Sequence, residues 1–405
     1  MNKHILVVSQ YFYPENFRIN DICLEWIKRG YKVTVITGIP NYPRGKFFKG
    51  YGFFRKRKEN HQGINIIRIP IIPRGNHSIT LALNYLSFVI SGWLWKTFTR
   101  IKADIVFNFE VSPMTQALPA VWYARRKNIP SFVYIQDLWP DNVQVVGGIQ
   151  NKRVLKYLDK ITNNIYRKSS KLLVTSESFK NTLISRDVSE NKIIYWPQYA
   201  ENHSIIKPIE NYYENYFKIM FTGNIGDAQG LEILPEVAIL LSEEGYLDRI
   251  RFILIGDGRN RNKLEERIDS LGIRNMFIFE GQKPSIEIPS YLAKADVAFL
   301  SFADNDLFRM TIPAKLQTYL VCGKPILAVA KGETKRIINE ADNGYCSNPG
   351  DTKALYDNII KFLESEESLL SKFAKNSKLY ADQKFSKQKL MNQLDQIIIT
   401  EVTDV

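Results

Sequence analysis

The sequence is poor in the residues from which disulfide frameworks and metal centres are built. Its 405 residues include three cysteines and four histidines. The cysteines, Cys23, Cys322 and Cys346, lack metal-ligand spacing and cannot all pair with one another. We therefore expect a reducing, cytoplasmic environment, no metal ion and no bound cofactor. The opening residues run directly into an apolar strand pattern without a cleavage motif, so we expect no secretory signal.

Acidic residues are scarce in the first half of the chain. Residues 1–200 carry 30 Lys and Arg against 12 Asp and Glu, whereas residues 201–405 carry 25 against 30. A basic half favours an anionic partner, which can be nucleic acid or an anionic bilayer. Because no nucleic-acid-binding motif is present, we expect a membrane surface and not nucleic acid.

Short apolar runs rich in β-branched residues recur with helical segments between them, which is typical of parallel sheets covered on both faces. Strands are predicted at residues 5–8, 33–37, 64–69, 105–109, 132–135, 172–175 and 193–196, and in a second series at 219–221, 252–255, 276–279, 297–300 and 325–329. The fold class is therefore α/β, with two tandem Rossmann-like, doubly wound domains.

A polar stretch without apolar periodicity, residues 200–215, is the predicted linker. It separates a first domain, 1–200, from a second, 201–384, and the helical pattern in 385–405 is a candidate to pack back on the first. Ligands of open α/β sheets bind beyond the carboxyl ends of the strands. We therefore expect a cleft between facing domains, lined by the loops that follow strands.

The loop after the first strand of the second domain has glycines at Gly223, Gly226 and Gly230. Such glycines let backbone amides approach an anion, and the following helix contributes its positive N-terminal end. The spacing matches neither the Walker loop nor the dinucleotide fingerprint, and turn geometry alone also explains it. We interpret the loop as a phosphate cradle because similar loops follow it.

Two of these loops have a simple local pattern. Asp257 and Gly258 form a glycine turn, which an ordinary left-handed turn also explains. Gln282 lies in a loop whose backbone can edge a nucleotide base. These residues are predicted to bind the donor.

The last loop leads into a helix that is expected to begin near Pro313, with Thr311 as a plausible cap. Arg309 precedes this helix and Lys315 lies one turn into it. Both cations can join the amides in binding phosphate. A solvated surface lysine is the alternative for Lys315, but its place beside the anion-suited loops favours phosphate binding.

Carboxylates follow strands of the first domain. Asp137 is predicted to orient or deprotonate an acceptor hydroxyl, or to line the sugar pocket. Asp141 is a further acceptor-side candidate, although it also suits a cap or turn beside Pro140. Glu110 is a weaker candidate.

The loop after the first strand of this domain carries Glu15, Asn16 and Arg18. They are predicted to meet an acceptor diphosphate or the donor sugar. The alternative is a helix start capped by Asn16 or Asn20.

Two segments of the first domain suit a membrane interface. Residues 47–58 interleave aromatics with cations, although a partly packed basic loop has the same composition. Residues 79–98 are almost continuously apolar over the length of a spanning helix, but Asn84, Ser87, Ser91 and Lys96 interrupt them. We therefore expect a core or interfacial helix there, not a spanning one.

The motifs in combination resemble a known family. They are Gly223-Asn-Ile-Gly-Asp-Ala-Gln-Gly-Leu-Glu232, Gly256-Asp-Gly258, Pro313-Ala-Lys-Leu-Gln-Thr-Tyr-Leu-Val-Cys-Gly-Lys-Pro325, Tyr11-Phe-Tyr-Pro-Glu-Asn-Phe-Arg-Ile-Asn-Asp21, Gly38-Ile-Pro-Asn-Tyr-Pro43 and Gln136-Asp-Leu-Trp-Pro-Asp141. They resemble retaining glycosyltransferase family 4, of the GT-B fold, and more narrowly the branch of O-antigen and capsule N-acetylfucosaminyltransferases.

The sequence departs from that family at four positions. Many members hold the donor diphosphate with Arg and Lys where this chain has Asn224 and Gln229, and carry two glutamates where it has Met310 and Thr318. We expect Arg309 and Lys315 to supply the lost positive charge. Thr318 or Gln317 is expected to reach the nucleotide ribose.

The resemblance implies metal-independent, retaining transfer of a sugar, N-acetyl-L-fucosamine in the narrower form, from a UDP-sugar to a polyprenyl-diphosphate-linked saccharide. The setting it implies is lipopolysaccharide O-antigen or capsule biosynthesis, with the basic first domain peripheral on the inner face of the cytoplasmic membrane. It further implies front-face transfer, in which the departing phosphate takes the acceptor proton. A nucleotide-sugar epimerase or hydrolase on the same fold and a non-catalytic nucleotide-sugar-binding subunit are the alternatives.

Overall fold

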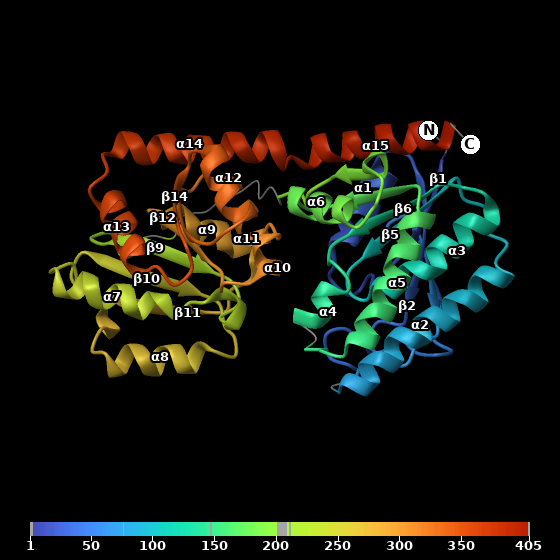
Figure 1. Cartoon of the computed structure of the whole chain (residues 1–405), viewed down its shortest axis with the longest axis horizontal. Helices are drawn as coiled ribbons and strands as arrows, with labels where there is room; N and C mark the ends of the chain where they lie inside the picture. The colour runs from blue at the N-terminus through green and yellow to red at the C-terminus, as the bar shows by residue number, and fades with distance from the viewer. Residues whose placement is uncertain (1–2, 76, 146–147, 201–208, 210–211, 404–405) are drawn as a thin grey trace. The chain divides into compact units, whose positions relative to one another are not determined.

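The computed structural model describes residues 3–75, 77–145, 148–200, 209 and 212–403 (Figure 1). The chain divides into two compact units. The first comprises residues 1–175, 179–196 and 393–405, and the second comprises residues 176–178 and 197–392. Most of the predicted linker, 200–215, lies outside the described residues.

The first unit has an eight-stranded sheet of order β3-β4-β2-β1-β5-β6-β7-β8. Its neighbouring strands are parallel except for the edge pair β3 and β4. Its strands are β1 His4–Val8, β2 Lys32–Gly38, β3 Lys58–His61, β4 Ile64–Ile69, β5 Ile105–Glu110, β6 Ser131–Ile135, β7 Lys171–Val174 and β8 Ile193–Tyr195. Its helices are α1 Arg18–Lys28, α2 Ser78–Phe98, α3 Leu118–Lys127, α4 Asp141–Val145, α5 Lys152–Lys168 and α6 Glu177–Ser185.

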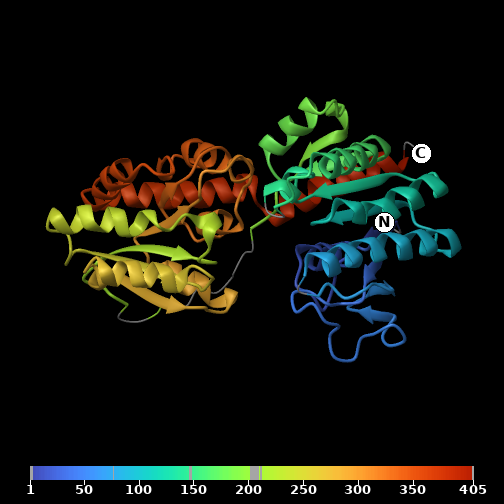
Figure 2. The same cartoon turned by 60° about the horizontal axis from the view of Figure 1, so that its bottom comes forward.

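The second unit has a wholly parallel six-stranded sheet of order β11-β10-β9-β12-β13-β14. Its strands are β9 Phe217–Thr222, β10 Ile250–Ile255, β11 Phe277–Gly281, β12 Val297–Ser301, β13 Ile326–Val329 and β14 Gly344–Ser347. Its helices are α7 Ile233–Glu243, α8 Arg261–Ser270, α9 Ile288–Lys294, α10 Asp306–Arg309, α11 Ala314–Val321, α12 Glu333–Ala341, α13 Thr352–Leu363 and α14 Glu367–Lys384. Two parallel sheets, each with helices on both faces, confirm the predicted doubly wound fold (Figures 1 and 2).

Alternate residues of the second sheet enter different cores, because successive side chains of a strand point to opposite faces. Phe221 and Leu254 belong to the cluster that α7, α8 and α13 cover. Met220 and Ile253 belong to the cluster that α9, α11 and α12 cover. The strands are apolar throughout because both faces are buried.

The last helix, α15 Lys387–Thr403, begins in the second unit and continues in the first. In the first unit Asp395 pairs with Arg29 at 2.7 Å, and Glu401 pairs with Lys171 at 3.0 Å. Residues 393–403 of the C-terminal segment thus pack on the first unit.

Helix α2 is not the core helix that the sequence allowed. Its buried residues are Asn84, Phe88 and Gly92, a single stripe at a spacing of four. Seven large apolar side chains on the rest of its surface are exposed: Ile79, Leu83, Leu86, Ile90, Trp93, Leu94 and Phe98. Among the described residues it is the one helix long and apolar enough to cross a membrane. Figure 1 shows it in light blue beside α3.

Candidate active site

The loop after β9 packs backbone against backbone on the loop after β10. Gly223 N donates to Ile255 O at 2.9 Å, and Ile225 N donates to Asp257 O at 2.9 Å. A Cβ on Gly256 would lie 1.8 Å from Gly223 O, and one on Gly258 would lie 2.2 Å from Ile225 O. Gly256 and Gly258 are therefore required by this close packing of backbones, and not by the ordinary left-handed turn that was the alternative, because neither Asp257 nor Gly258 has a positive φ.

Other donors of the β9 loop are not used in this way. The amides of Asn224 and Gly226 have no acceptor in the described part of the chain. The Asn224 side chain lies 3.4 Å from Gln229 Oε1. Gly230 adopts the left-handed conformation, with φ +55°, against the backbone of Ala303. The loop therefore keeps free amides, while α7 begins only at Ile233, later than the predicted start near Gly230.

Lys315 lies beside this loop. Its stem is half-exposed, but its Nζ is buried and has no hydrogen-bond partner among the described residues. Nζ lies 4.2 Å from the centroid of the Phe221 ring and 3.4 Å from the place of a Cβ on Gly223. Burial lowers the pKa of Lys315 to about 7. A buried amine without a partner, next to free amides, is suited to an anionic group that supplies its missing contacts.

The start of α11 differs from the prediction. Pro313 is its N-cap residue, and no side chain caps the helix. Thr311 is not the cap, because its hydroxyl donates to Leu307 O at 2.9 Å. The Thr318 hydroxyl donates to Ala314 O at 3.2 Å, within the helix. Gln317 is buried and donates to Gln198 O at 2.6 Å, so its amide is not available to a ribose as predicted.

Arg309 is a weaker source of positive charge than expected. Its guanidinium pairs with Asp304 at 2.6 Å and with Asp306 at 2.8 Å. Two neighbouring carboxylates thus neutralise it, and all three side chains are exposed. Lys315 is therefore the uncompensated cation of the predicted pair.

The remaining donor-side candidates lie on the surface. Asp257 Oδ1 accepts from Gly258 N at 2.8 Å, which closes the predicted turn. Gln282 is exposed in the loop after β11. A hollow of about 330 Å³ between the β9 loop and α8 contains Gly226 but none of the other predicted donor-site residues, and we do not assign it to the donor.

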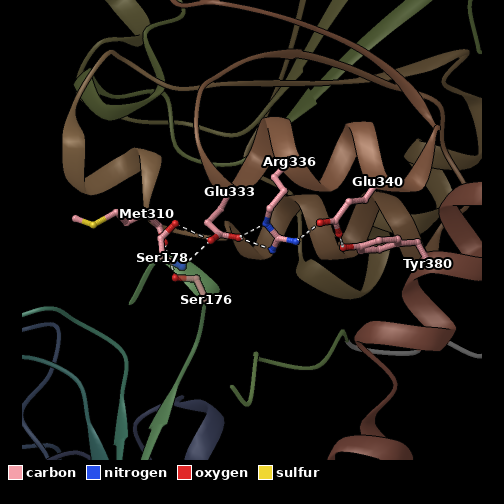
Figure 3. Close-up of polar contacts among 7 residues, drawn as sticks. All are labelled: Ser176, Ser178, Met310, Glu333, Arg336, Glu340 and Tyr380. Carbon is pink, nitrogen blue, oxygen red and sulfur yellow. Dashed lines mark hydrogen bonds and ion pairs between the residues drawn. The ribbon is translucent and has the colours of Figure 1, made fainter. Parts of the chain in front are cut away.

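Glu333 is a buried carboxylate near Met310, where one of the two glutamates is absent, because the preceding Gly332 packs on Arg309 O. Its oxygens are fully engaged (Figure 3). Oε1 accepts from Ser178 N at 2.7 Å and from Ser178 Oγ at 2.6 Å, while Oε2 accepts from Arg336. The chain of contacts continues from Arg336 through Glu340 to Tyr380. Glu333 is thus a structural residue and not a replacement for those glutamates.

Met310 itself contributes its backbone to the same region. Its carbonyl accepts from Ser176 Oγ at 2.6 Å (Figure 3). Ser176 and Ser178 belong by their contacts to the second unit, although they follow β7 in sequence. The loop that precedes α11 is therefore anchored through main-chain and side-chain bonds.

In the first unit, Asp137 is held by one serine. Its Oδ2 accepts from Ser112 N at 2.9 Å and from Ser112 Oγ at 2.8 Å. Ser112 Oγ in turn accepts from Trp139 Nε1 at 3.0 Å and from Asn142 Nδ2 at 2.9 Å. A hydroxyl has one proton and two lone pairs, so these two donors direct the proton to Asp137. Oδ1 of Asp137 receives no hydrogen bond from the described residues and can face a ligand.

Glu110 lies beneath Asp137 and is wholly buried. Its Oε2 is 3.5 Å from Asp137 N, and its Oε1 has no partner among the described residues. Burial raises the pKa of Glu110 well above its ordinary value, and the charge of Asp137 raises it further. Glu110 therefore lies in the core against the backbone of Asp137 and does not reach solvent.

Glu15 is not available to an acceptor. Its Oε1 accepts from Asn41 N and Tyr42 N, both at 2.7 Å, and its Oε2 accepts from Phe12 N at 3.2 Å. Burial raises the pKa of Glu15 to about 7, against these hydrogen bonds. Its role is to join the loops after β1 and β2.

Of the other acceptor-side candidates, some are exposed and some have partners within the protein. Asn16 is exposed, and Arg18 begins α1, whose N-cap residue is Phe17. Asn20 bonds to Glu15 O rather than capping the helix. Asp141 is the first residue of α4, beside Pro140, and its carboxylate pairs with Arg186.

Sequence reasoning missed Ser112, Arg74 and Tyr85. Ser112 comes two residues after the end of β5, at the edge of the sheet where Asp137 lies, and this position is a usable signal. Arg74 donates through Nη1 to the Tyr11 hydroxyl at 3.4 Å, and Tyr85 lies on α2. No local pattern identifies these two.

Comparisons with known proteins place both domains in known families. Residues 17–198 match the family described as Glycosyltransferase Family 4, and residues 202–380 match the family described as Glycosyl transferases group 1. The chain is 24% identical over 390 residues to the putative colanic acid biosynthesis glycosyl transferase WcaI of Escherichia coli K12, which covers 91% of this chain and 92% of that protein.

Two solved structures share the fold. The sucrose-phosphate synthase of Thermosynechococcus elongatus superposes with a TM-score of 0.74 at 14% identity, over 100% of both chains. Anabaena HepE in complex with UDP has a TM-score of 0.70 at 15% identity, over 98% of this chain and 100% of that one. The chain thus consists of the two domains of a GT-B glycosyltransferase, a family 4 domain followed by a group 1 domain.

Proposed function

We propose that this glycosyltransferase moves a sugar, with retention of anomeric configuration and without a metal ion, from a UDP-sugar to a polyprenyl-diphosphate-linked saccharide in surface polysaccharide biosynthesis. The observation that carries the donor half is Lys315, whose buried Nζ has no partner among the described residues beside the glycine loop after β9. HepE, which shares the fold, was solved with UDP, and WcaI is named for colanic acid biosynthesis.

The donor half neutralises the charge of the leaving diphosphate. Lys315 Nζ takes up a proton when an anion arrives, because the anion favours its charged form. The free amides of the β9 loop and the N-terminal end of α11 add positive potential. These groups stabilise charge that grows as the bond between the sugar and the diphosphate breaks.

The acceptor half places a hydroxyl. Asp137 Oδ1 accepts a hydrogen bond from the acceptor hydroxyl, while Ser112 fixes Oδ2. The acceptor oxygen forms its bond to the sugar on the face that the diphosphate leaves. As this bond forms, the acceptor proton leaves its hydrogen bond with Asp137 Oδ1 and passes to the departing phosphate oxygen.

The first unit supplies a surface for an anionic bilayer. The exposed apolar side chains of α2 form a stripe along the helix, from Ile79 to Phe98. A turn closed by the bridge between Gly52 and Arg55 presents Phe54, which is 99% exposed, with exposed cations at Arg55 and Lys56. Apolar side chains flanked by cations fit the interface of a membrane with anionic lipids.

The function is tested with purified protein, a panel of nucleotide sugars and a polyprenyl-diphosphate-linked N-acetylhexosamine. We expect a mass increase of one sugar on the acceptor and, by NMR, the donor's anomeric configuration in the product. An N-acetylfucosamine product supports the narrower specificity. Sugar release or epimerisation from donor alone supports the hydrolase or epimerase alternative, and donor binding without turnover on any lipid-linked acceptor supports a binding subunit.

The membrane surface is tested by sedimentation with vesicles that contain anionic phospholipid. Replacing Leu86 and Ile90 with serine should lower the vesicle partition coefficient about 10- to 100-fold, because full burial of such a side chain contributes about 1.5–3 kcal/mol and these two are already about half buried in the protein. Ile286→Ser is the matched control, since Ile286 is a 71% exposed apolar residue of the second unit. Equal binding of the double variant and the control would rule out this surface.

A further inference from the structure

Arg74 is an uncompensated cation in the first unit, between β4 and α2. Its backbone N donates to the buried Asn41 Oδ1 at 2.9 Å. Its guanidinium lies 5.3 Å from the centroid of the Tyr42 ring, and Nη1 donates to the Tyr11 hydroxyl at 3.4 Å. No carboxylate among the described residues pairs with it. The aromatic neighbours thus fix the position of the side chain and leave its charge available.

The surroundings of Arg74 are built as a platform. The rings of Tyr11, Phe17 and Tyr42 contact one another, with centroids 5.2 to 5.5 Å apart. Aromatic faces also pack well against sugar rings, because both surfaces are flat and partly apolar. Tyr11 is buried, so the rings that the cation shares with a saccharide are those of Phe17 and Tyr42, which are partly exposed.

Tyr85 connects this platform with Asp137. Burial raises the pKa of Tyr85, the Arg74 charge lowers it, and the Asp137 charge raises it. Tyr85 thus lies within electrostatic reach of both the cation and the carboxylate that we assign to the acceptor hydroxyl.

Helix α2, which carries Tyr85, also carries exposed apolar side chains. Tyr85 has Leu83 and Leu86 as near neighbours on α2, and both are exposed. The apolar side chains thus lie on the helix that also carries Tyr85, and Tyr85 is within electrostatic reach of the cation and the carboxylate. A lipid-linked saccharide presents three corresponding groups, a hydrocarbon, a diphosphate and a sugar.

We propose that Arg74 binds a phosphate group of the acceptor, with the lipid along α2 and the sugar toward Asp137. This inference rests on the proposed function. A guanidinium binds phosphate oxygens in a two-pronged manner, which suits a site that must orient as well as attract. Arg68 shows the contrasting case, because it is fully buried and already holds Glu59 and the Tyr13 carbonyl.

The test compares two acceptors in detergent, a short-chain prenyl-diphosphate N-acetylhexosamine and an alkyl N-acetylhexosaminide without phosphate. For Arg74→Gln, kcat/KM with the diphosphate acceptor should fall about 10- to 100-fold, the range for a hydrogen bond to a charged group. With the alkyl acceptor it should change less than about twofold. Arg74→Lys should restore part of the loss. A sugar-free prenyl diphosphate should inhibit the wild type and should lose potency against Arg74→Gln.

Arg100→Gln is the control, because it removes one exposed cation near the far end of α2. UDP binding checks that each variant is folded. If Arg74→Gln lost equal activity with both acceptors, or lost none with either, the proposed role of Arg74 would be wrong. The proposed function would still stand, provided that the wild type turns over the diphosphate acceptor. A loss seen only with acidic-sugar acceptors, whether or not they carry phosphate, would also overturn the proposed role of Arg74. Absence of turnover by the wild type on every acceptor would instead contradict the proposed function.

Discussion

Arg68 in the first unit and Lys315 in the second both withdraw a cationic group from water, and their surroundings differ. Arg68 is 0% exposed and pairs with Glu59 at 2.6 Å, donates to Tyr13 O at 2.7 Å and lies over the Tyr51 ring. Lys315 Nζ has an aromatic ring beside it and no hydrogen-bond acceptor in the described chain. Since an unpaired buried charge is costly, the first arrangement serves the fold and the second is completed by a ligand.

Lys315→Met should give the largest changes in donor affinity and stability among the variants that test this comparison. Donor affinity and transfer should fall about 100-fold or more, because a positioned cation for the leaving group is lost. The free energy of unfolding at pH 7 should rise by roughly 2–4 kcal/mol, because the cost of burying the amine disappears. Calorimetry and steady-state kinetics measure the two effects.

Lys324→Met is the matched control for Lys315→Met. Lys324 is another largely buried lysine of the second unit, but its Nζ donates to Ala293 O at 3.0 Å and Ala295 O at 2.8 Å. Its loss should destabilise the protein and leave donor affinity unchanged. If both variants behaved alike, the contrast between satisfied and unsatisfied lysines would be wrong.

Arg68→Met should lower the free energy of unfolding and leave donor affinity unchanged, the reverse of the result expected for Lys315→Met. It removes the partner of Glu59 and the donor to Tyr13 O, so the free energy of unfolding should fall by about 3 kcal/mol. UDP binding should persist wherever the variant is folded, because this cation serves the first unit. Denaturant unfolding followed in the presence and absence of UDP measures both quantities. A stabilised Arg68→Met variant would break the comparison.

The pH dependence of donor binding sharpens the assignment of Lys315. Burial lowers the pKa of Lys315 to about 7 in the free protein, and a bound diphosphate raises it. Binding therefore takes up a proton above pH 7, and affinity should fall up to about tenfold per pH unit between pH 7 and 8.5. Calorimetry of UDP-sugar binding in buffers of different ionisation enthalpy measures the proton uptake. Lys315→Met should abolish this dependence.

The smallest effects are expected for Ser112→Ala and Asn142→Ala, which alter the hydrogen bonds that hold Asp137 in the first unit. Ser112→Ala removes the hydroxyl that fixes Asp137 Oδ2, so kcat should fall about tenfold while the donor KM stays constant. Asn142→Ala should give a smaller loss of the same kind, because Trp139 still orients the hydroxyl. An unchanged kcat in Ser112→Ala, or a loss confined to thermal stability, would remove Ser112 as a positioning residue.

Most strands could be predicted because buried parallel strands are continuously apolar. Predicted strand 64–69 coincides with β4, and the other predicted strands lie within two residues of the observed ones. The missed strands, β3 and β14, form the edges of the two sheets. β3 has the sequence Lys-Glu-Asn-His, which carries no apolar signal because neither face of that strand is buried.

Site residues could be predicted by position but not by contact. Asp137 and Lys315 lie where loops after strands place them, and both have the open atoms that the proposed reaction uses. Glu15 and Gln317 lie in equally suggestive segments and are occupied by backbone partners. The difference arises from loops and helices distant in sequence, which no local pattern contains.

The sequence by itself determined two doubly wound domains, a basic first half and the loops in which site residues occur, because periodicity and charge are local properties. Tertiary structure alone decided which charged groups are satisfied. Arg68 meets Glu59 across the edge pair of strands, whereas Lys315 meets only the Phe221 ring and the Gly223 loop. A side chain's partner is set by the packing of segments far apart in the chain, and that packing separates a structural cation from one that is free to bind a ligand.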